Sequence, residues 1–360
     1  MVDLMGNRFA SLLQSKMSAE SFKKLLALEN ESLFEFVGEY VALCQPASVY
    51  MCDDSDEDAE YLRRRAIELG EETPLARPGH TVHYDGYDDQ GRAPGATKNL
   101  VSKADLPLMK SLQAMDRDVG LAEVREILQG IMEGKEAVVK LSCEGPTLSP
   151  FSIACAQISD SFYVCHSEEL LYRRGYEHFM KMDRKDRFFR FVHSAGRLDE
   201  RGCSVDLDKR RIYQDLEEMI VLSTNNQYAG NSVGLKKHAM RLAIRLSGKE
   251  GWLCEHMFVM AVQNEQKARA TYFCGAFPSA CGKTATAMLP GEKIVGDDIA
   301  YFRNINGEFR AVNVENGIFG IIKDVNAEDD PVIYRTLQTP GLEIIFSNIL
   351  TGPDNLPYWL

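Results

Sequence analysis

One short segment constrains the fold of this chain more than any other. An apolar stretch at 270–276 runs into the sequence FPSACGKT at 277–284, and a helix-compatible run follows at 285–288. A strand that leads through such a loop into a helix is the setting of a phosphate-binding loop, in which Lys283 reaches the β- and γ-phosphates and the Thr284 hydroxyl joins the Mg²⁺ shell. Phe277, however, stands where the usual pattern has glycine. From these residues alone, a nucleotide-binding loop and an ordinary strand-to-helix turn both remain open.

Two adjacent carboxylates follow the next apolar stretch of the chain. The stretch at 293–296 leads directly into Asp297 and Asp298. In P-loop enzymes, an aspartate in this place holds the metal ion of the nucleotide. An exposed turn with two acidic residues is the alternative, and the loop upstream favours the metal-holding interpretation.

The rest of the chain reads as a mixture of helices and strands. Its 360 residues with 45% hydrophobic content exceed what one compact domain usually needs, so two domains are expected. The charged run 181–190 is expected to be a solvated helix face, and the overall pattern indicates a mixed α/β fold. The spacing of apolar residues predicts helices within 17–44, with Ser18 as a cap, and at 121–132 and 236–246. Apolar runs predict strands at 137–141, 151–158, 219–222 and 257–262.

Composition excludes several classes of function. Lys and Arg total 41 against 53 Asp and Glu, and a net charge of -12 repels a polyanion, so no nucleic-acid partner is expected. No stretch approaches the roughly 18 apolar residues of a membrane helix, and residues 1–16 lack the apolar run of a signal peptide. The nine cysteines are scattered without a CxxC pair, which is typical of reduced thiols. We therefore expect a cytoplasmic location without a membrane partner.

Two further features are unusual for a simple nucleotide-binding protein. The pair Lys236 and Lys237 opens one predicted helix, and His256 stands at the start of a predicted buried strand. Taken singly, a solvated lysine pair and a satisfied histidine at the edge of a core are the commoner interpretations. The positions of Lys236, Lys237 and His256 relative to the loop and the paired carboxylates favour a functional interpretation of all three.

The order and spacing of these features closely resemble the GTP-dependent phosphoenolpyruvate carboxykinases. That family's loop also has phenylalanine in place of glycine, so the departure at Phe277 becomes a match. Weaker similarity runs through HSAG at 193–196 and GP at 145–146 back to Arg92. The strong resemblance is carried by YAGNS at 228–232, KK at 236–237, EHM at 255–257, FPSACGKT at 277–284, VGDD at 295–298 and ENG at 315–317.

The resemblance implies one Mn²⁺ ion held by a lysine, a histidine and an aspartate, which correspond here to Lys237, His256 and Asp298. A lysine can bind a metal only as the neutral amine. Such a set leaves positions for water or substrate oxygens, which suits Mn²⁺ better than a closed zinc site. The helix between the lysine pair and His256 is a residue shorter than the family's, so Lys236 is the alternative ligand.

The resemblance also implies the reaction and its residues. Oxaloacetate loses CO₂ to give pyruvate enolate, whose oxygen takes the γ-phosphoryl group of GTP to yield phosphoenolpyruvate and GDP. Mg²⁺ accompanies GTP with Thr284 as a ligand, and Asp297 holds a water on a metal. The residues carried over are Ser279, Cys281 and Lys283 for catalysis; Ala280, Cys281, Gly282, Lys283 and Thr284 for the nucleotide; and Arg92, Tyr228, Ala229, Gly230 and Ser279 for the substrate.

Two of these assignments have plainer alternatives. Arg92 as a fork for the substrate carboxylate competes with an ordinary exposed loop arginine, because residues 93–97 follow the family pattern only loosely. Cys281 is a candidate reactive thiol near a helix start, or simply a small residue that fits the turn.

For the fold, the resemblance implies a mixed-sheet, substrate-binding domain at 1–250 and the start of a P-loop nucleotide- and metal-binding domain at 251–360. Family members continue beyond the point that corresponds to Leu360, through the slot that selects guanine and a mobile lid. The resemblance therefore implies a monomeric carboxykinase that acts in gluconeogenesis or in the anaplerotic reverse of its reaction. The alternative is a truncated or split-gene fragment that binds metal or nucleotide and needs a complementary C-terminal chain. A generic P-loop kinase is disfavoured because it leaves Lys237 and His256 unexplained.

Overall fold

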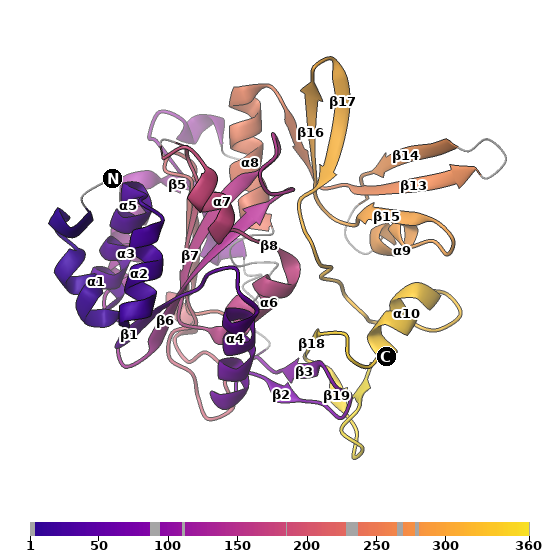
Figure 1. The fold of residues 1–360 in the computed structure, drawn as a ribbon, viewed down its shortest axis with the longest axis horizontal. Coiled ribbons are helices and arrows are strands. Elements are labelled where there is room, and N and C mark those ends of the chain that lie inside the picture. The colour runs from indigo at the N-terminus through magenta and orange to yellow at the C-terminus, as the bar shows by residue number, and fades with distance from the viewer. Residues whose placement is uncertain are drawn as a thin grey trace.

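Nine strands within the described residues form one mixed sheet in the first part of the chain (Figure 1). The structure is a computed structural model that describes residues 4–86, 94–109, 112–184, 186–227, 237–264, 269–277 and 281–359. The strand order is β1-β6-β7-β9-β11-β10-β4-β5, with β8 beside β6. The strands are β1 (Ser48–Met51), β4 (Thr97–Val101), β5 (Ala114–Asp116), β6 (Glu136–Glu144), β7 (Ile153–Ser159), β8 (Arg173–Arg174), β9 (Phe189–Ser194), β10 (Arg211–Asp215) and β11 (Ile220–Thr224). The predicted mixed α/β fold is confirmed.

Both faces of this sheet are covered, and alternation along each strand assigns side chains to one face or the other. Ile158 and Leu222 join the apolar core under the N-terminal helices. Their neighbours Cys155 and Val221 join a second core with residues of α8 (Lys237–Glu250). Because β7 and β11 are buried on both faces, their sequences are apolar or small almost throughout. The covering helices on the first face are α1 (Ala10–Lys16), α2 (Ala19–Ala27), α3 (Glu31–Cys44) and α5 (Arg117–Leu128).

Helix ends follow local capping chemistry. The predicted cap Ser18 is confirmed, since its hydroxyl accepts the backbone N–H of Ser21 at 3.0 Å. The predicted helix at 121–132 ends earlier, at Leu128, because the chain takes a left-handed φ of +69° at Gly130. Further helices are α4 (Asp56–Glu68), α6 (Phe162–Leu171) and α7 (Tyr176–Lys181), with short 3₁₀ turns at Leu4–Gly6, Pro94–Ala96, Leu106–Leu108 and Leu207–Lys209.

The prediction of a helix at the charged run 181–190 is wrong. Helix α7 ends at Lys181, and β9 begins at Phe189. The backbone N–H of Asp186 donates to the carbonyl of Asp183 at 2.8 Å, and the N–H of Asp183 donates to the Asp186 carboxylate at 3.2 Å. This local turn offers the backbone partners that a helix would otherwise provide.

The second part of the chain forms two small antiparallel sheets, which Figure 1 shows on the side away from the N-terminal helices. The ring of Trp252 packs edge-on against Tyr301 at 5.1 Å between centroids, inside the core that the first part shares. One sheet contains β12 (Leu253–Glu255), β16 (Ala300–Ile305) and β17 (Glu308–Asn313). The other contains β13 (Phe258–Asn264), β14 (Arg269–Gly275) and β15 (Lys293–Gly296), with α9 (Lys283–Ala287) beside it.

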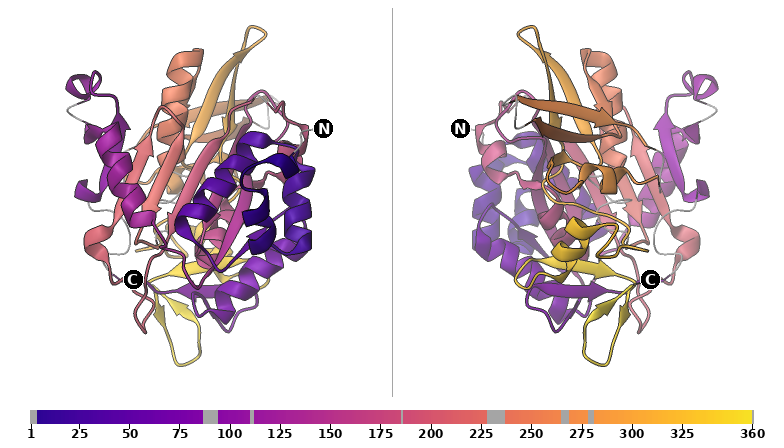
Figure 2. Two further views of the ribbon diagram at one scale, coloured as in Figure 1. Left: turned by 90° about the vertical axis from the view of Figure 1, so that its left-hand side faces the viewer. Right: turned by 90° about the vertical axis from the view of Figure 1, so that its right-hand side faces the viewer.

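The chain then returns to its first part. Strand β18 (Ile344–Ser347) pairs in parallel with β3 (His80–His83), which also pairs with β2 (Thr73–Pro74). Figure 2 shows this yellow segment beside the purple strand at the base of the molecule. The remaining elements are α10 (Pro331–Gln338) and the pair β19 (Leu350–Thr351) and β20 (Pro357–Tyr358). None of the helices in the described part of the chain is long and apolar enough to span a membrane.

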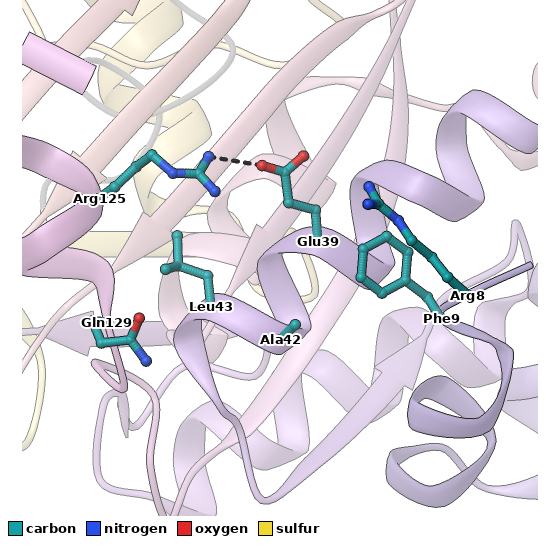
Figure 3. Close-up of a pocket in the computed structure, with 7 residues that line it drawn as sticks. All are labelled: Arg8, Phe9, Glu39, Ala42, Leu43, Arg125 and Gln129. Carbon is teal, nitrogen blue, oxygen red and sulfur yellow. Dashed lines mark hydrogen bonds and ion pairs between the residues drawn. The ribbon is translucent and has the colours of Figure 1, made fainter. Parts of the chain in front are cut away.

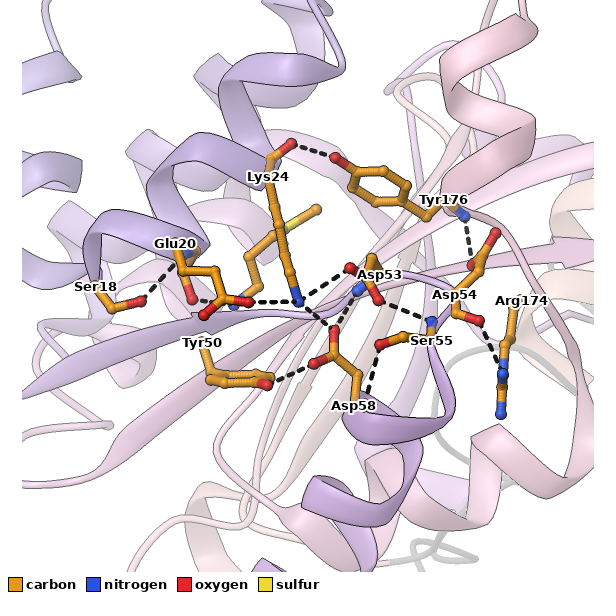
Figure 4. A network of polar contacts seen from close by, with 12 residues as sticks. Ser18, Glu20, Lys24, Tyr50, Asp53, Asp54, Ser55, Asp58, Arg174 and Tyr176 are labelled. Carbon is orange, nitrogen blue, oxygen red and sulfur yellow. Dashed lines mark hydrogen bonds and ion pairs between the residues drawn. The ribbon is translucent and has the colours of Figure 1, made fainter.

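A network of charges ties the N-terminal helices to the sheet (Figure 4). Lys24 of α2 contacts the buried carboxylate of Asp58 at 2.7 Å, and Asp58 also accepts the Tyr50 hydroxyl at 2.6 Å. Ser55 caps α4 by accepting the N–H of Asp58 at 3.3 Å. A hydroxyl from α7 closes the network, because Tyr176 donates to the carbonyl of Lys24 at 2.7 Å. Helices far apart in sequence are therefore held together by directed contacts as well as by apolar packing.

A buried histidine fastens the returning segment. His166 of α6 lies between two carboxylates, with Nδ1 2.7 Å from Glu72 and Nε2 3.0 Å from Glu343. Glu343 directly precedes β18, and Glu72 directly precedes β2. Burial by itself would lower the pKa of His166, but the hydrogen bonds to Glu343 and Glu72 raise it to about 9. The imidazolium thus links both strands that flank β3 to one helix.

We expect His166→Gln to flatten the pH dependence of the unfolding free energy. The folded-state pKa of about 9 lies above the ordinary value of 6.5, so the charged ring stabilises the fold fully below pH 6.5. This contribution, on the order of 3 kcal/mol, is lost as pH rises through about 9. Urea unfolding at about pH 6 and about pH 9.5 measures it. Parallel losses of stability in the parent protein and the variant would show that His166 does not carry this dependence.

Candidate nucleotide and metal site

The pairing of the two small sheets brings three predicted site residues together. β12 pairs with β16, and β13 pairs with β15, both in antiparallel fashion. His256 lies on the connection from β12 to β13, while Asp297 and Asp298 lie on the connection from β15 to β16. One segment of the chain contributes β12 and then β13, and a later segment contributes β15 and then β16. Because β12 pairs with β16 and β13 pairs with β15, the connection from β12 to β13 meets the connection from β15 to β16 at the junction between the sheets.

Asp298 is the centre of the site. Its Oδ1 is 2.6 Å from Nε2 of His256, and the same oxygen forms an ion pair with the amino group of Lys283. Lys283 also donates to the backbone carbonyl of Asp298 at 3.2 Å. Lys283 and Asp298 are both buried, and a buried charge requires a partner of opposite sign. Lys283 of the predicted phosphate loop and His256, a predicted metal ligand, therefore meet at the carboxylate of Asp298, the other predicted ligand in this set.

The neighbouring carboxylate contacts the loop directly. The Thr284 hydroxyl donates to Oδ2 of Asp297 at 3.0 Å, and Asp297 is buried. A hydroxyl and a carboxylate in contact are the kind of oxygen donors that Mg²⁺ takes in nucleotide sites. The two adjacent aspartates thus face different parts of the same loop.

The local backbone explains how the loop enters its helix. Gly282 has a φ of +82°, a left-handed conformation that favours glycine, and α9 begins at Lys283. The predicted helix at 285–288 therefore begins two residues earlier than expected. Ser279 and Ala280 lie outside the described residues, so their assignments stay predictions.

Two side chains of this site have donor atoms that suit a divalent metal ion. Nε2 of His256 and Oδ1 of Asp298 are close enough to bind one ion side by side, provided that the ring carries its hydrogen on Nδ1. Within the described ranges, no group of three His, Cys, Asp or Glu side chains could hold a metal ion. Helix α8 begins at Lys237, but the side chain of Lys237 and the whole of Lys236 lie outside the description. His256 and Asp298 thus provide a nitrogen and an oxygen donor of the kinds that divalent transition metals bind.

The predicted substrate residues Arg92, Tyr228, Ala229 and Gly230 also lie outside the described residues, but their flanks are described. The Gln227 side-chain amide donates to the carbonyl of Gly202 at 2.5 Å. A Cβ placed on Gly202 would lie 4.0 Å from the carbonyl oxygen of Tyr84. The turn at Gly202 therefore binds the side chain of the residue that precedes Tyr228. No motif in the sequence marks Gly202 for this contact.

Two cysteine side chains near the loop are exposed. They are Cys281 in the loop and Cys274 on β14, whereas most other cysteines are buried. All nine cysteines have free thiols, as the sequence predicts. Partial burial raises the pKa of the Cys274 thiol. Reagents can reach both thiols, which makes Cys274 an internal reference for Cys281.

A groove of about 410 Å³ lies elsewhere, among the N-terminal helices (Figure 3). Arg8 stacks over the Phe9 ring at 4.6 Å, and Arg125 pairs with Glu39 at 2.7 Å. Helices α1, α3 and α5 lie on the opposite side of the molecule from α9 (Figure 1). The groove is therefore not part of the candidate site.

Comparisons with known proteins identify both parts of the chain. Residues 35–248 match the model of the phosphoenolpyruvate carboxykinase N-terminal domain, and residues 252–360 match that of the phosphoenolpyruvate carboxykinase C-terminal P-loop domain. Together these models account for nearly all of the chain.

Curated relatives match over almost the same span. The phosphoenolpyruvate carboxykinase [GTP] of Thermococcus sibiricus is 51% identical over 348 residues, which are 96% of this chain and 55% of the relative. The protein of that name from Pyrococcus horikoshii is 52% identical with the same coverage. That from Saccharolobus solfataricus is 42% identical and covers 96% of this chain and 54% of the relative. The chain thus spans about half the length of the curated relatives it matches.

We expect His256→Ala to weaken Mn²⁺ binding at least about tenfold, because a direct ligand would be lost. The matched control is His178→Ala on α7, which removes a histidine from a different part of the fold. Isothermal titration with Mn²⁺ alone gives both affinities. Equal affinities in the two variants would remove His256 from the proposed metal site.

Proposed function

Because this chain belongs to the GTP-dependent phosphoenolpyruvate carboxykinase family, we propose that its site serves oxaloacetate decarboxylation and phosphoryl transfer from GTP. In this reaction CO₂ leaves oxaloacetate, the bond electrons remain as pyruvate enolate, and the enolate oxygen displaces GDP from the γ-phosphorus. The proposal rests on the contacts that the adjacent residues Asp297 and Asp298 make with the loop and with His256. One of them binds Thr284, and the other binds both Lys283 and His256.

On the phosphate side, the loop supplies charge and hydrogen bonds. A bound metal would neutralise the carboxylate of Asp298. Lys283 would then leave Asp298 and bind the negatively charged β- and γ-phosphate oxygens. Thr284 would bind the Mg²⁺ that accompanies GTP, and Asp297 would orient a water on a metal. The remaining proposed nucleotide contacts are the loop residues Ala280, Cys281 and Gly282.

On the substrate side, His256, Asp298 and Lys237 would hold Mn²⁺, with Lys236 as the alternative lysine. A bound Mn²⁺ would supply positive charge beside the oxygen on which the enolate charge develops. Arg92 would bind the substrate carboxylate as a fork. Tyr228, Ala229, Gly230 and Ser279 complete the proposed substrate contacts. The hydrogen bond from the Gln227 side chain to the carbonyl of Gly202 supports a fixed start for the segment at Tyr228.

We also propose a domain boundary between residues 250 and 251. The end of α8 at Glu250 and the gap between the two matched family models support it. The packing across this boundary is extensive, since Trp252 and Tyr301 belong to the same core as Phe191 of β9. Strand β18 also pairs with β3 of the first part. The two domains would therefore move against each other only with repacking of this core.

A second candidate function is a fragment that binds metal and nucleotide and reacts only with a complementary chain. The observation that favours it is the surface around β14, an edge strand of its sheet. Tyr272 is 67% exposed, Phe273 49% and Ile294 40%. Aromatic side chains on both faces of an edge strand are a common sign of a surface that other protein covers.

The decisive experiment measures conversion of oxaloacetate to phosphoenolpyruvate by this chain with GTP and Mn²⁺. We expect turnover that falls at least about 100-fold in Lys283→Ala, because the charge on the transferring phosphoryl group is no longer neutralised. The control Lys293→Ala removes an exposed lysine from the next strand and should keep full activity. No turnover, with Mn²⁺ binding intact, would reject the self-sufficient enzyme. Recovery on addition of the remaining part of a relative would then support the complementary-chain alternative.

Nucleotide binding has a test that does not need turnover. We expect GTP with Mg²⁺ to slow the reaction of Cys281 with a thiol reagent at least about fivefold, because the proposed phosphate contacts cover the loop. The exposed Cys274 should react at an unchanged rate. Peptide mass spectrometry after limited labelling distinguishes the two thiols. Equal protection of both, or of neither, would contradict phosphate binding at the loop.

A further inference from the structure

A buried histidine lies at the carboxyl ends of three neighbouring parallel strands. Strands β7, β9 and β11 run in the same direction, and His193 of β9 is opposite Ser159 of β7 and Ser223 of β11. In open α/β sheets, ligands bind beyond this end of the strands. His193 opens the segment HSAG at 193–196, which carries family similarity but has no part in the reaction as described above.

Both ring nitrogens of His193 are engaged. Nε2 is 2.8 Å from the carbonyl oxygen of Asn226, and Nδ1 is 2.7 Å from the hydroxyl of Ser159. A carbonyl oxygen can only accept, so Nε2 carries the ring hydrogen, and the neutral ring accepts the Ser159 hydrogen at Nδ1. The Ser159 oxygen in turn accepts the backbone N–H of Ser161 at 3.1 Å. A single ring orientation and tautomer satisfies the whole chain of hydrogen bonds.

The surroundings of His193 exclude a direct part in the chemistry. The residue is 0% exposed, so neither substrate nor solvent reaches the ring. Burial lowers the pKa of His193, which keeps the imidazole neutral. A neutral, enclosed ring with both nitrogens occupied cannot transfer protons to a substrate. It can fix the position of the groups that it binds.

A second network holds the backbone next to this contact. The Asp160 carboxylate accepts the Ser194 hydroxyl at 2.6 Å, the N–H of Ala195 at 2.9 Å and the Lys135 amino group at 2.8 Å. The carbonyl of Ser194 accepts the N–H of Asn225 at 2.9 Å. Residues 193–195 are therefore a rigid support. The chain that leaves β11 is tied to this support at two successive residues.

We propose that His193 is a positioning residue for the substrate segment that begins at Tyr228. The proposal rests on the proposed function, which assigns Tyr228, Ala229 and Gly230 to substrate binding. By binding the carbonyl of Asn226, His193 fixes the direction in which the chain leaves the sheet just ahead of Tyr228. The Asn226 side chain strengthens this hold, because its amide donates to the Ser223 hydroxyl at 2.8 Å and to the Thr224 carbonyl at 3.2 Å.

Two amide variants separate the two functions of the ring. In His193→Gln, the side-chain amide nitrogen can reach the place of Nε2 and keep the hydrogen bond to Asn226. In His193→Asn, the shorter amide reaches only the place of Nδ1, so the contact with Ser159 remains and that with Asn226 is lost. Both variants introduce a neutral amide into the same buried position, and each keeps one of the two hydrogen bonds of the ring while losing the other.

The first measurement is amide hydrogen exchange by mass spectrometry without any ligand. We expect exchange in peptides covering 225–236 to be about tenfold faster in His193→Asn and near the parent rate in His193→Gln, since one buried hydrogen bond is lost. Peptides from the N-terminal helices should not change in either variant. Equal exchange at 225–236 in both variants would overturn the positioning role.

The second measurement is the binding of phosphoenolpyruvate in the presence of Mn²⁺, followed by calorimetry. We expect about tenfold weaker binding in His193→Asn, rescue in His193→Gln, and unchanged GTP affinity in both. Weakening of GTP and phosphoenolpyruvate together would indicate general damage and would also overturn the proposal. Failure of the parent protein to bind phosphoenolpyruvate would instead reject the proposed function, while the exchange data would still decide whether His193 holds the segment.

Discussion

The antiparallel register of β12 with β16 and of β13 with β15 is the constraint on which the candidate site depends. It brings the connection at His256 against the connection at Asp297 and Asp298, which are about forty residues away along the chain. The loop after β14 reaches the same junction because β14 pairs with the other edge of β13. Strand pairing therefore brings side chains from these three separate segments of the chain together.

Charge compensation explains how charged side chains are accommodated at this junction. Asp298 is buried and neutralised by Lys283, with His256 at hydrogen-bonding distance from the same oxygen. Such a buried cluster holds its members in place, yet each contact can be exchanged for one to a phosphate or a metal of the appropriate charge. The contact of Thr284 with Asp297 adds a second link between the loop and the carboxylates.

The first part of the chain contributes support on a larger scale. Parallel strands end in polar groups at His193 and Ser159, and the hydrogen bonds there control how the chain leaves the sheet towards Tyr228. The returning strand β18 is fastened beside β3 by the His166 contacts, so the segment that leads towards Arg92 also starts from a fixed strand. In both cases a buried neutral or paired group fixes the strand end from which a proposed substrate segment departs.

Local sequence patterns were enough to predict the mixed α/β class, the cap at Ser18, the strand before Asp297 and a helix after the loop, although α9 begins at Lys283, before the predicted residues 285–288. The sequence also identified the family through motif order. It failed at 181–190, where the turn between Asp183 and Asp186 outweighs helical charge patterning. The structure was needed to show that Asp298 joins Lys283 to His256, that Gln227 binds the carbonyl of Gly202, and that His193 binds Asn226. These contacts depend on strand register and on long-range packing, which residue spacing does not encode.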